Sequence, residues 1–173
     1  MNYNEIVEVM KLAYRLKVQK RYNHIPRIYQ ESVSEHSYEV CLASVLLADA
    51  YLREHLIDFK KLVRMAVVHD LAEVRVADIP HDTKTLFPKF AAELQRLECK
   101  VLGELLHSRD WSFLLSEYND KSSIEALIVN LADVLSCKVY AENELAMGNT
   151  NFARVLQESD CRIVEIKERL DKL

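Results

Sequence analysis

Apolar residues recur at intervals of three and four along almost the whole chain, which is the spacing of helices that bury one face. The helix expected before residue 148 is apolar around most of its circumference, so we expect it at the centre of the fold. These patterns predict an all-α bundle of about six or seven helices in a single domain, residues 1–173. The expected helices cover residues 4–20, 32–53, 58–75, 88–107, 110–118, 122–147 and a stretch that begins near 151.

Several helix ends carry sequence signals of their own. The pattern Ser-x-x-Glu, typical of a capping box, occurs at Ser32 and again at Ser122. Asp58 is a typical N-cap residue, and Pro88 suits the first turn of a helix. Gly148 is the residue type expected just after a helix ends.

The composition excludes several functional classes. Of 173 residues, 50% are hydrophobic and 29% charged, as in a folded domain with a sizeable core. The two glycines, Gly103 and Gly148, cannot build a P-loop or a dinucleotide-binding turn. A net charge of -4 argues against a broad face for a nucleic acid polymer. We expect a cytoplasmic protein without membrane contact, because no signal peptide or membrane-spanning stretch is visible and the cysteines lack C-x-x-C spacing.

Candidate chemistry begins with an adjacent histidine and aspartate: His69 continues an apolar helix face, and Asp70 sits about a quarter-turn round the helix. Ionisable groups are costly to bury unless a partner or a metal ion satisfies them. His36 shares a face with apolar residues of its own helix, and Asp133 has apolar neighbours one turn away. Taken alone, His36 is more readily a core histidine hydrogen-bonded to the backbone, and Asp133 could lie on a solvated face.

Together these residues come from three separate predicted helices, which is how metal sites are assembled in helical bundles. Two imidazoles with two carboxylates suit one divalent ion of intermediate hardness, such as Co, Mn, Zn, Ni or Fe. A structural zinc site would more typically include cysteine. The residues therefore predict one metal ion, with positions left open for water and a substrate oxygen, at His36, His69, Asp70 and Asp133.

The order His…His-Asp…Asp on successive helices resembles the HD-domain metal-dependent phosphohydrolase superfamily. Several short sequence blocks resemble one branch of this superfamily more closely, the bacterial 5'-deoxynucleotidases (YfbR-like). The similarity runs from Arg21 to about Phe152. A lone His-Asp pair is a weak signal, whereas these blocks in this order are a specific one. The blocks are Ser34-Glu35-His36-Ser37, His69-Asp70-x-x-Glu73, Asp78-Ile79-Pro80, Lys84, Ala132-Asp133 and the segment from Glu144 to Asn149.

The resemblance implies a single-metal phosphomonoesterase that converts deoxynucleoside 5'-monophosphates to deoxynucleoside and phosphate. The four predicted ligands match the family's metal-ligand positions. Glu73 matches its acidic catalytic position, and Asp78 a second acid that helps to hold water and substrate. A bound metal ion lowers the pKa of water. Glu73, alone or with Asp78, would accept the proton of that water and help to protonate the leaving 5'-oxygen.

The resemblance also implies contacts to the substrate. Arg21 falls where the family keeps an arginine that contacts phosphate or sugar, and Lys84 matches a basic position near the pocket. Tyr22 replaces the tryptophan of the bacterial enzyme, and Ala77 replaces the glycine usual before the Asp-x-Pro turn. These departures concern base and sugar selectivity more than the chemistry.

The loop before the first ligand helix offers further candidates for substrate binding. Tyr22, His24 and Arg27 suit contact with a base or sugar, and they suit ordinary loop packing equally well. The forked guanidinium of Arg21 is well shaped for phosphoryl oxygens.

Two other functions stay open at this point. The same metal site would serve a compact triphosphohydrolase that releases triphosphate from a deoxynucleoside triphosphate, as in small phage dATPases. A non-catalytic helical module that senses nucleotides is a third reading, although a scaffold has no need of such a set of site residues. In either enzyme reading the partner is a deoxynucleotide, and the family tends to form homodimers or larger homo-oligomers.

Overall fold

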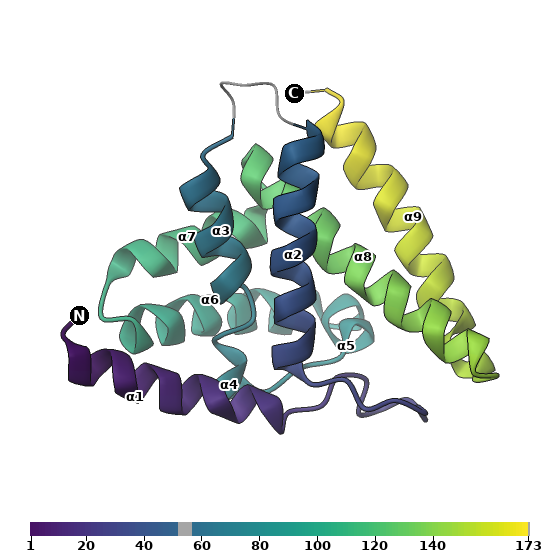
Figure 1. Cartoon of the computed structure of the whole chain (residues 1–173), viewed down its shortest axis with the longest axis horizontal. Helices are drawn as coiled ribbons and strands as arrows, with labels where there is room; N and C mark the ends of the chain where they lie inside the picture. Colours follow the sequence, from purple (N-terminus) through teal and green to yellow (C-terminus); the bar gives the residue numbers. More distant parts are fainter. Residues whose placement is uncertain (52–56, 173) are drawn as a thin grey trace.

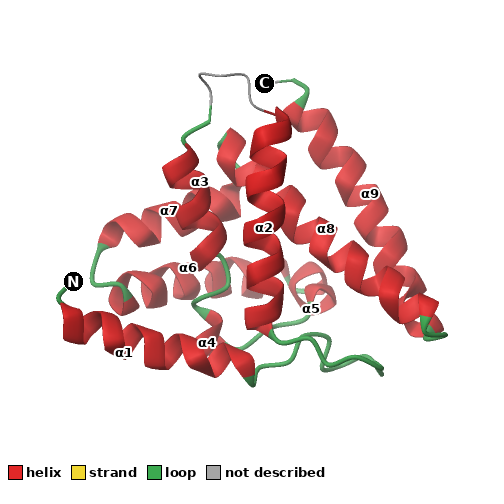
Figure 2. Cartoon of the chain, viewed as in Figure 1, coloured by secondary structure: helices red, strands yellow, loops and turns green. Residues whose placement is uncertain are grey.

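The computed structural model describes residues 1–51 and 57–172, and within these ranges the chain is helical with no strand (Figure 1 and Figure 2). Seven of its α-helices have ten residues or more, so the predicted all-α fold of six or seven helices is confirmed. In chain order the elements are α1 (Tyr3–Ala13), η1 (Tyr14–Lys17), α2 (Val33–Tyr51), α3 (Phe59–Val68), α4 (Glu73–Val76), α5 (His81–Leu86), α6 (Pro88–Leu105), α7 (Arg109–Asp120), α8 (Ile124–Ala146), η2 (Thr150–Phe152) and α9 (Ala153–Leu170), where η marks a short 3-10 helix.

Helix α8 lies at the centre of the fold, as its all-round apolar sequence predicts. It packs against α2, α3, α7 and α9, and Figure 1 shows it crossing α2 with α9 beside it. Ile128, Val129 and Leu131 on α8 have no exposed surface. Burying a side chain of this size stabilises a fold by about 1.5–3 kcal/mol. Any polar residue that α8 holds among these neighbours is therefore held in a rigid position.

Most of the predicted helix ends are confirmed. Ser32 and Glu35 form the capping box of α2: the Ser32 hydroxyl accepts from the Glu35 backbone at 3.2 Å, and the Glu35 carboxylate from the Ser32 backbone at 2.7 Å. The Asp58 carboxylate caps α3. Pro88 is the first residue of α6, and Gly148 follows α8 with a φ of +92°.

The second predicted capping box is wrong. Ser123, not Ser122, caps α8, and its hydroxyl accepts from the backbone of Ala126 at 3.2 Å. The Glu125 carboxylate does not turn back to the helix end. It accepts from the Asp58 backbone N–H and pairs with Lys61, both at 2.7–2.8 Å, so it joins α8 to the start of α3.

Two other helix boundaries and one short helix differ from the sequence prediction. The α-helix expected over residues 4–20 ends at Ala13 and continues as η1. The helix expected over 58–75 ends at Val68, and α4 begins only at Glu73. Helix α5 was not predicted. The expected end of the second helix at Arg53 lies outside the described residues.

A buried glutamate holds the long loop between η1 and α2. Glu144 has no exposed surface, and its carboxylate accepts from the backbone N–H groups of Ile28 and Tyr29 at 2.8 and 2.7 Å. The Asn149 side chain donates to the same carboxylate at 2.6 Å. Charge-assisted bonds of this kind are roughly twice as strong as neutral ones. The loop that carries Arg21 is therefore tied to the end of α8.

Within the described ranges, none of the helices combines the length and the apolar character needed to cross a membrane.

Ala77, which follows α4, has a backbone conformation that normally requires glycine. Its φ is +64° and its ψ is 165°. A side chain in this region costs of order 1–3 kcal/mol. The residue stands directly before Asp78 and is exposed, so no packing of its methyl group offsets that cost.

Replacing Ala77 by glycine is expected to stabilise the fold. Relief of the strain outweighs the roughly 0.5–1 kcal/mol of extra chain entropy that glycine brings to the unfolded state. We expect Ala77→Gly to raise the free energy of unfolding by about 1 kcal/mol in urea denaturation. Ala92→Gly, at an exposed position within α6, is the matched control and should lower it by about 1 kcal/mol. A loss of stability in both variants would show that Ala77 is not strained.

Candidate functional site

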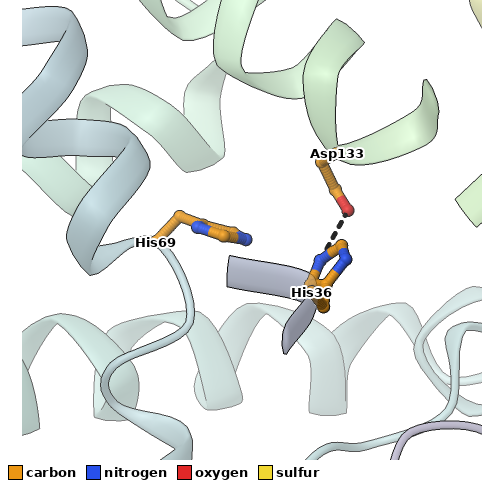
Figure 3. Close-up of side chains that lie close together, drawn as sticks. All are labelled: His36, His69 and Asp133. Carbon is orange, nitrogen blue, oxygen red and sulfur yellow. Dashed lines mark ion pairs between the residues drawn. The ribbon is translucent and has the colours of Figure 1, made fainter. Parts of the chain in front are cut away.

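Three segments that are distant in sequence bring two imidazoles and the Asp133 carboxylate together (Figure 3). His36 comes from α2, Asp133 from α8, and His69 and Asp70 from the turn after α3. The His36 Nε2 lies 3.3 Å from Asp133 Oδ1 and 3.5 Å from Asp70 Oδ2. The His69 Nε2 lies 3.2 Å from Asp70 Oδ2. The structure thus places all four predicted ligands side by side.

A chain of two hydrogen bonds that begins at the Nδ1 of His36 fixes the tautomer of its ring. Its Nδ1 lies 3.0 Å from the hydroxyl of Ser136, and that hydroxyl donates to the Glu39 carboxylate at 2.7 Å. Since the hydroxyl proton is used for Glu39, the Ser136 oxygen accepts from the His36 Nδ1–H. The neutral ring therefore presents a lone pair at Nε2, toward Asp70 and Asp133.

The His69 ring is held in the same tautomer, with its proton on Nδ1, by a different partner. Its Nδ1 lies 2.8 Å from the carbonyl oxygen of Ala66, which can only accept, so Nδ1 carries the proton. Its Nε2 is buried and has no hydrogen-bond partner among the described residues. In a continuing helix the Ala66 carbonyl would accept from the Asp70 backbone N–H instead. The imidazole takes that position, which accounts for the end of α3 at Val68.

The electrostatics of the cluster favour a bound cation. Burial and the charge of Arg21 lower the pKa of His36 to about 4, so its ring is neutral. Burial acts to raise the pKa of Asp133, but the adjacent His36 imidazole, with His69 and Arg162, holds it well below its usual range. Burial acts to lower the pKa of His69, yet the negative charges of Asp70 and Asp133 raise it. The two carboxylates therefore favour a positive charge beside the His69 ring. Two lone pairs and two carboxylates fit one divalent ion.

A cavity of about 330 Å³ opens beside this cluster, within the range of small-molecule sites. Apart from Arg27, all the residues predicted for catalysis and substrate binding line it, together with three of the four predicted ligands: Arg21, Tyr22, His24, His36, Asp70, Glu73, Asp78, Lys84 and Asp133. Arg27 does not line the cavity. Its guanidinium donates to the Tyr22 carbonyl at 2.7 Å, so ordinary loop packing is the correct reading of Arg27.

Two carboxyl groups in the cavity have the properties of proton carriers. Glu73 is 7% exposed, and burial together with the charges of Asp70 and Asp78 raises its pKa well above the usual value. Burial also raises the pKa of Asp78, with Arg21 opposing the change. The Glu73 Oε2 is buried and has no hydrogen-bond partner among the described residues. A carboxyl group with a raised pKa is suited to exchange protons near neutral pH.

Arg21 and Tyr22 form the wall supplied by the loop. The Arg21 guanidinium pairs with the Glu31 carboxylate at 2.6 Å and donates to the Cys137 sulfur at 3.1 Å. The Tyr22 ring stacks on Tyr140, with 5.0 Å between ring centres. Both side chains are therefore held in fixed positions where they border the cavity.

The sequence prediction missed the wall that α9 supplies. The cavity-lining residues of this wall recur every three or four positions along one side of the helix, beside the apolar stripe that packs on the core. This spacing was the available signal, but polar residues there look like an ordinary solvated face. The residues that line the cavity on this side are Asn151 of η2 and, from α9, Arg154, Val155, Glu158, Ser159 and Arg162.

A family model described as "HD domain" matches residues 13–169 of the chain. The chain belongs to the HD-domain family. This confirms the predicted family and the predicted class of enzyme, a metal-dependent phosphohydrolase. A curated relative from Vibrio vulnificus, named 5'-deoxynucleotidase VV1113, is 28% identical over 163 residues, which are 88% of this chain and 82% of the relative.

Solved structures share the fold of this HD domain. A conserved hypothetical protein from Pyrococcus furiosus is 27% identical, with a TM-score of 0.77 over 96% of this chain and 99% of its own. The HD phosphohydrolase DatZ of cyanophage S-2L, bound to dA and one catalytic Zn²⁺ ion, has a TM-score of 0.61 and 16% identity. It covers 94% of this chain and 96% of its own, and at that identity the likeness concerns the fold alone.

Ser136 is expected to support metal binding by this HD domain through the orientation of His36. Partners that orient a metal-ligating histidine typically contribute 10–100-fold to metal affinity. We therefore expect Ser136→Ala to weaken the affinity for a divalent ion about 10–100-fold in competition with a chelating dye. Ser44→Ala is the matched control: Ser44 is buried on α2, and its hydroxyl has no partner among the described residues.

The control should keep the metal affinity of the parent. Its free energy of unfolding should rise by about 1 kcal/mol, because an unpaired buried hydroxyl is removed. An equal affinity for metal in Ser136→Ala and the parent would contradict the orienting role of Ser136.

Proposed function

We propose that this HD-domain protein hydrolyses deoxynucleoside 5'-monophosphates to deoxynucleoside and phosphate. The observation that carries the proposal is the convergence of two imidazoles with the carboxylates of Asp133 and Asp70, beside a cavity that also contains two further acids and an arginine. The curated relatives named 5'-deoxynucleotidases, which match about nine-tenths of the chain, support the choice of substrate.

The proposed ligands of one divalent ion are His36, His69, Asp70 and Asp133. Their nitrogen and oxygen donors suit Zn, Mn, Co, Fe or Ni, and the zinc ion of DatZ is in keeping with this set. A bound ion of this kind supplies Lewis-acid polarisation of a phosphoryl oxygen and lowers the pKa of water.

The two acids of the cavity would handle protons. Glu73 accepts the proton of the attacking water, since its raised pKa makes it a stronger base than an ordinary carboxylate. Asp78, whose pKa is also raised, holds the water in place and helps to return a proton to the leaving 5'-oxygen. The other side chains of the cavity would bind the nucleotide. Arg21 contacts phosphoryl oxygens, and Tyr22, His24 and Lys84 border the space for sugar and base.

Product analysis tests the proposal directly. Protein loaded with each candidate metal is incubated with deoxynucleoside mono- and triphosphates and with the matching ribonucleotides, and the products are separated by chromatography. We expect inorganic phosphate and deoxynucleoside from the deoxynucleoside monophosphates. Release of triphosphate from dATP, with dAMP left intact, would instead establish a triphosphohydrolase. Binding of nucleotides without turnover of any of them would establish a nucleotide-sensing module.

Glu73 and Asp133 should separate turnover from metal binding. We expect Glu73→Gln to keep its metal and to lose turnover about 10²–10⁴-fold, because the carboxylate that takes the proton is gone. Asp133→Ala should lose the metal as well, measured by elemental analysis of the purified protein. Glu98→Gln, a half-buried glutamate of α6 that does not line the cavity, is the control and should retain both. Full turnover by Glu73→Gln would exclude Glu73 from the mechanism.

A further inference from the structure

Among the cavity residues that α9 supplies, Arg162 is positioned to act on the charges of the metal cluster. His36, Asp70 and Asp133 of that cluster line the same cavity as Arg162. The side chain is half-buried and borders the cavity. The guanidinium therefore belongs to the same electrostatic environment as the proposed metal site.

The two arginines that α9 brings to the cavity differ in their partners. Arg154 is 70% exposed, and its guanidinium pairs with Glu158 at 2.7 Å and with Asp82 at 3.4 Å. Arg162 makes no ion pair with any carboxylate in the part of the chain that the structure describes. A half-buried guanidinium without a carboxylate partner, facing a cavity, is suited to an anion that enters from outside.

The charge balance of the site shows why such a cation is needed. A divalent ion is neutralised by the carboxylates of Asp70 and Asp133. A phosphate monoester carries about -1.5 to -2 at neutral pH. The charge of Arg21 is balanced by Glu31, with which it pairs at 2.6 Å. Lys84 lies close enough to Glu73 and Asp78 to lower the pKa of both, so its charge is shared with those acids.

We propose that Arg162 binds the phosphate group of the substrate from the α9 wall of the cavity, as a positioning residue in addition to Arg21. This inference rests on the proposed function in that the ligand is a dianionic phosphate monoester. Its fork of N–H donors can hold two phosphoryl oxygens at once, whereas a lysine offers a point charge.

The experiment compares Arg162→Gln and Arg162→Lys with the parent and with Arg96→Gln. Arg96 lies on the outer surface of α6, 73% exposed, so Arg96→Gln removes the same charge far from the cavity. Three quantities are measured on metal-loaded protein: the affinity for inorganic phosphate by calorimetry, KM and kcat for a deoxynucleoside monophosphate, and the metal content.

We expect Arg162→Gln to weaken phosphate binding and to raise KM at least tenfold, with a smaller change in kcat and an unchanged metal content. Arg162→Lys should recover part of the affinity, and Arg96→Gln should match the parent. A role confined to packing would lower the thermal stability and leave the phosphate affinity of the folded protein unchanged. Parent-like phosphate affinity and KM in Arg162→Gln would overturn the proposal.

Two further outcomes keep this inference separate from the proposed function. If Arg162→Gln does not fold, Arg162→Lys decides: a several-fold loss of phosphate affinity supports the bidentate contact, and parent-like affinity overturns it. If the parent binds phosphate through Arg162 but hydrolyses no monophosphate, the proposed substrate is wrong while the phosphate site stands. If the parent hydrolyses monophosphates and Arg162→Gln does so equally well, only the role of Arg162 fails.

Discussion

Two buried imidazoles that present their Nε2 lone pairs to the same small volume are the constraint on which the rest of this structure depends. Each ring is held by its other nitrogen, His36 through Ser136 and His69 through the Ala66 carbonyl. Two carboxylates occupy the same volume, so the cluster carries negative charge among apolar helices. Such a group is unfavourable unless a cation joins it. The fold thus holds ready a site whose electrostatic energy is lowest with a metal ion bound.

The frame around the cluster explains how the charged groups stay in place. Asp133 is carried by α8, the helix whose other residues form the centre of the core. Glu144, near the end of the same helix, holds the loop that contains Arg21 and Tyr22. One rigid helix therefore positions a proposed metal ligand at its middle and, from its end, the side of the cavity that is proposed to bind phosphate. Sites on rigid elements keep the geometry that catalysis requires more closely than sites on free loops.

Sequence periodicity located His36, which shares a helix face with Val40, and His69, which follows the apolar stripe of α3. Asp70, in the turn after α3, was found as the neighbour of His69. The remaining differences depend on contacts between distant segments. The break after Val68 follows from the imidazole of His69 bonding to Ala66, and the cap of α8 moves to Ser123 because Glu125 is recruited by α3. The α9 wall was missed for a similar reason. Which flank of an amphipathic helix faces a cavity is decided by the helix on which it packs.

Recognition of a phosphate monoester in such a site is a problem of charge balance across helices. A divalent ion compensates for the carboxylates that hold it, and the acids that move protons add further negative charge when they ionise. Binding of a dianion to this cavity is therefore favoured when the positively charged side chains outnumber the carboxylates that remain ionised, leaving aside the metal ion and its ligands. Burial raises the pKa values of Glu73 and Asp78, so these acids are easier to protonate than ordinary carboxylates and repel a dianion less. The same shift suits the proton transfer proposed for them, so the proposed binding of the dianion and the proposed transfer of the proton have a common physical origin in the burial of these two acids.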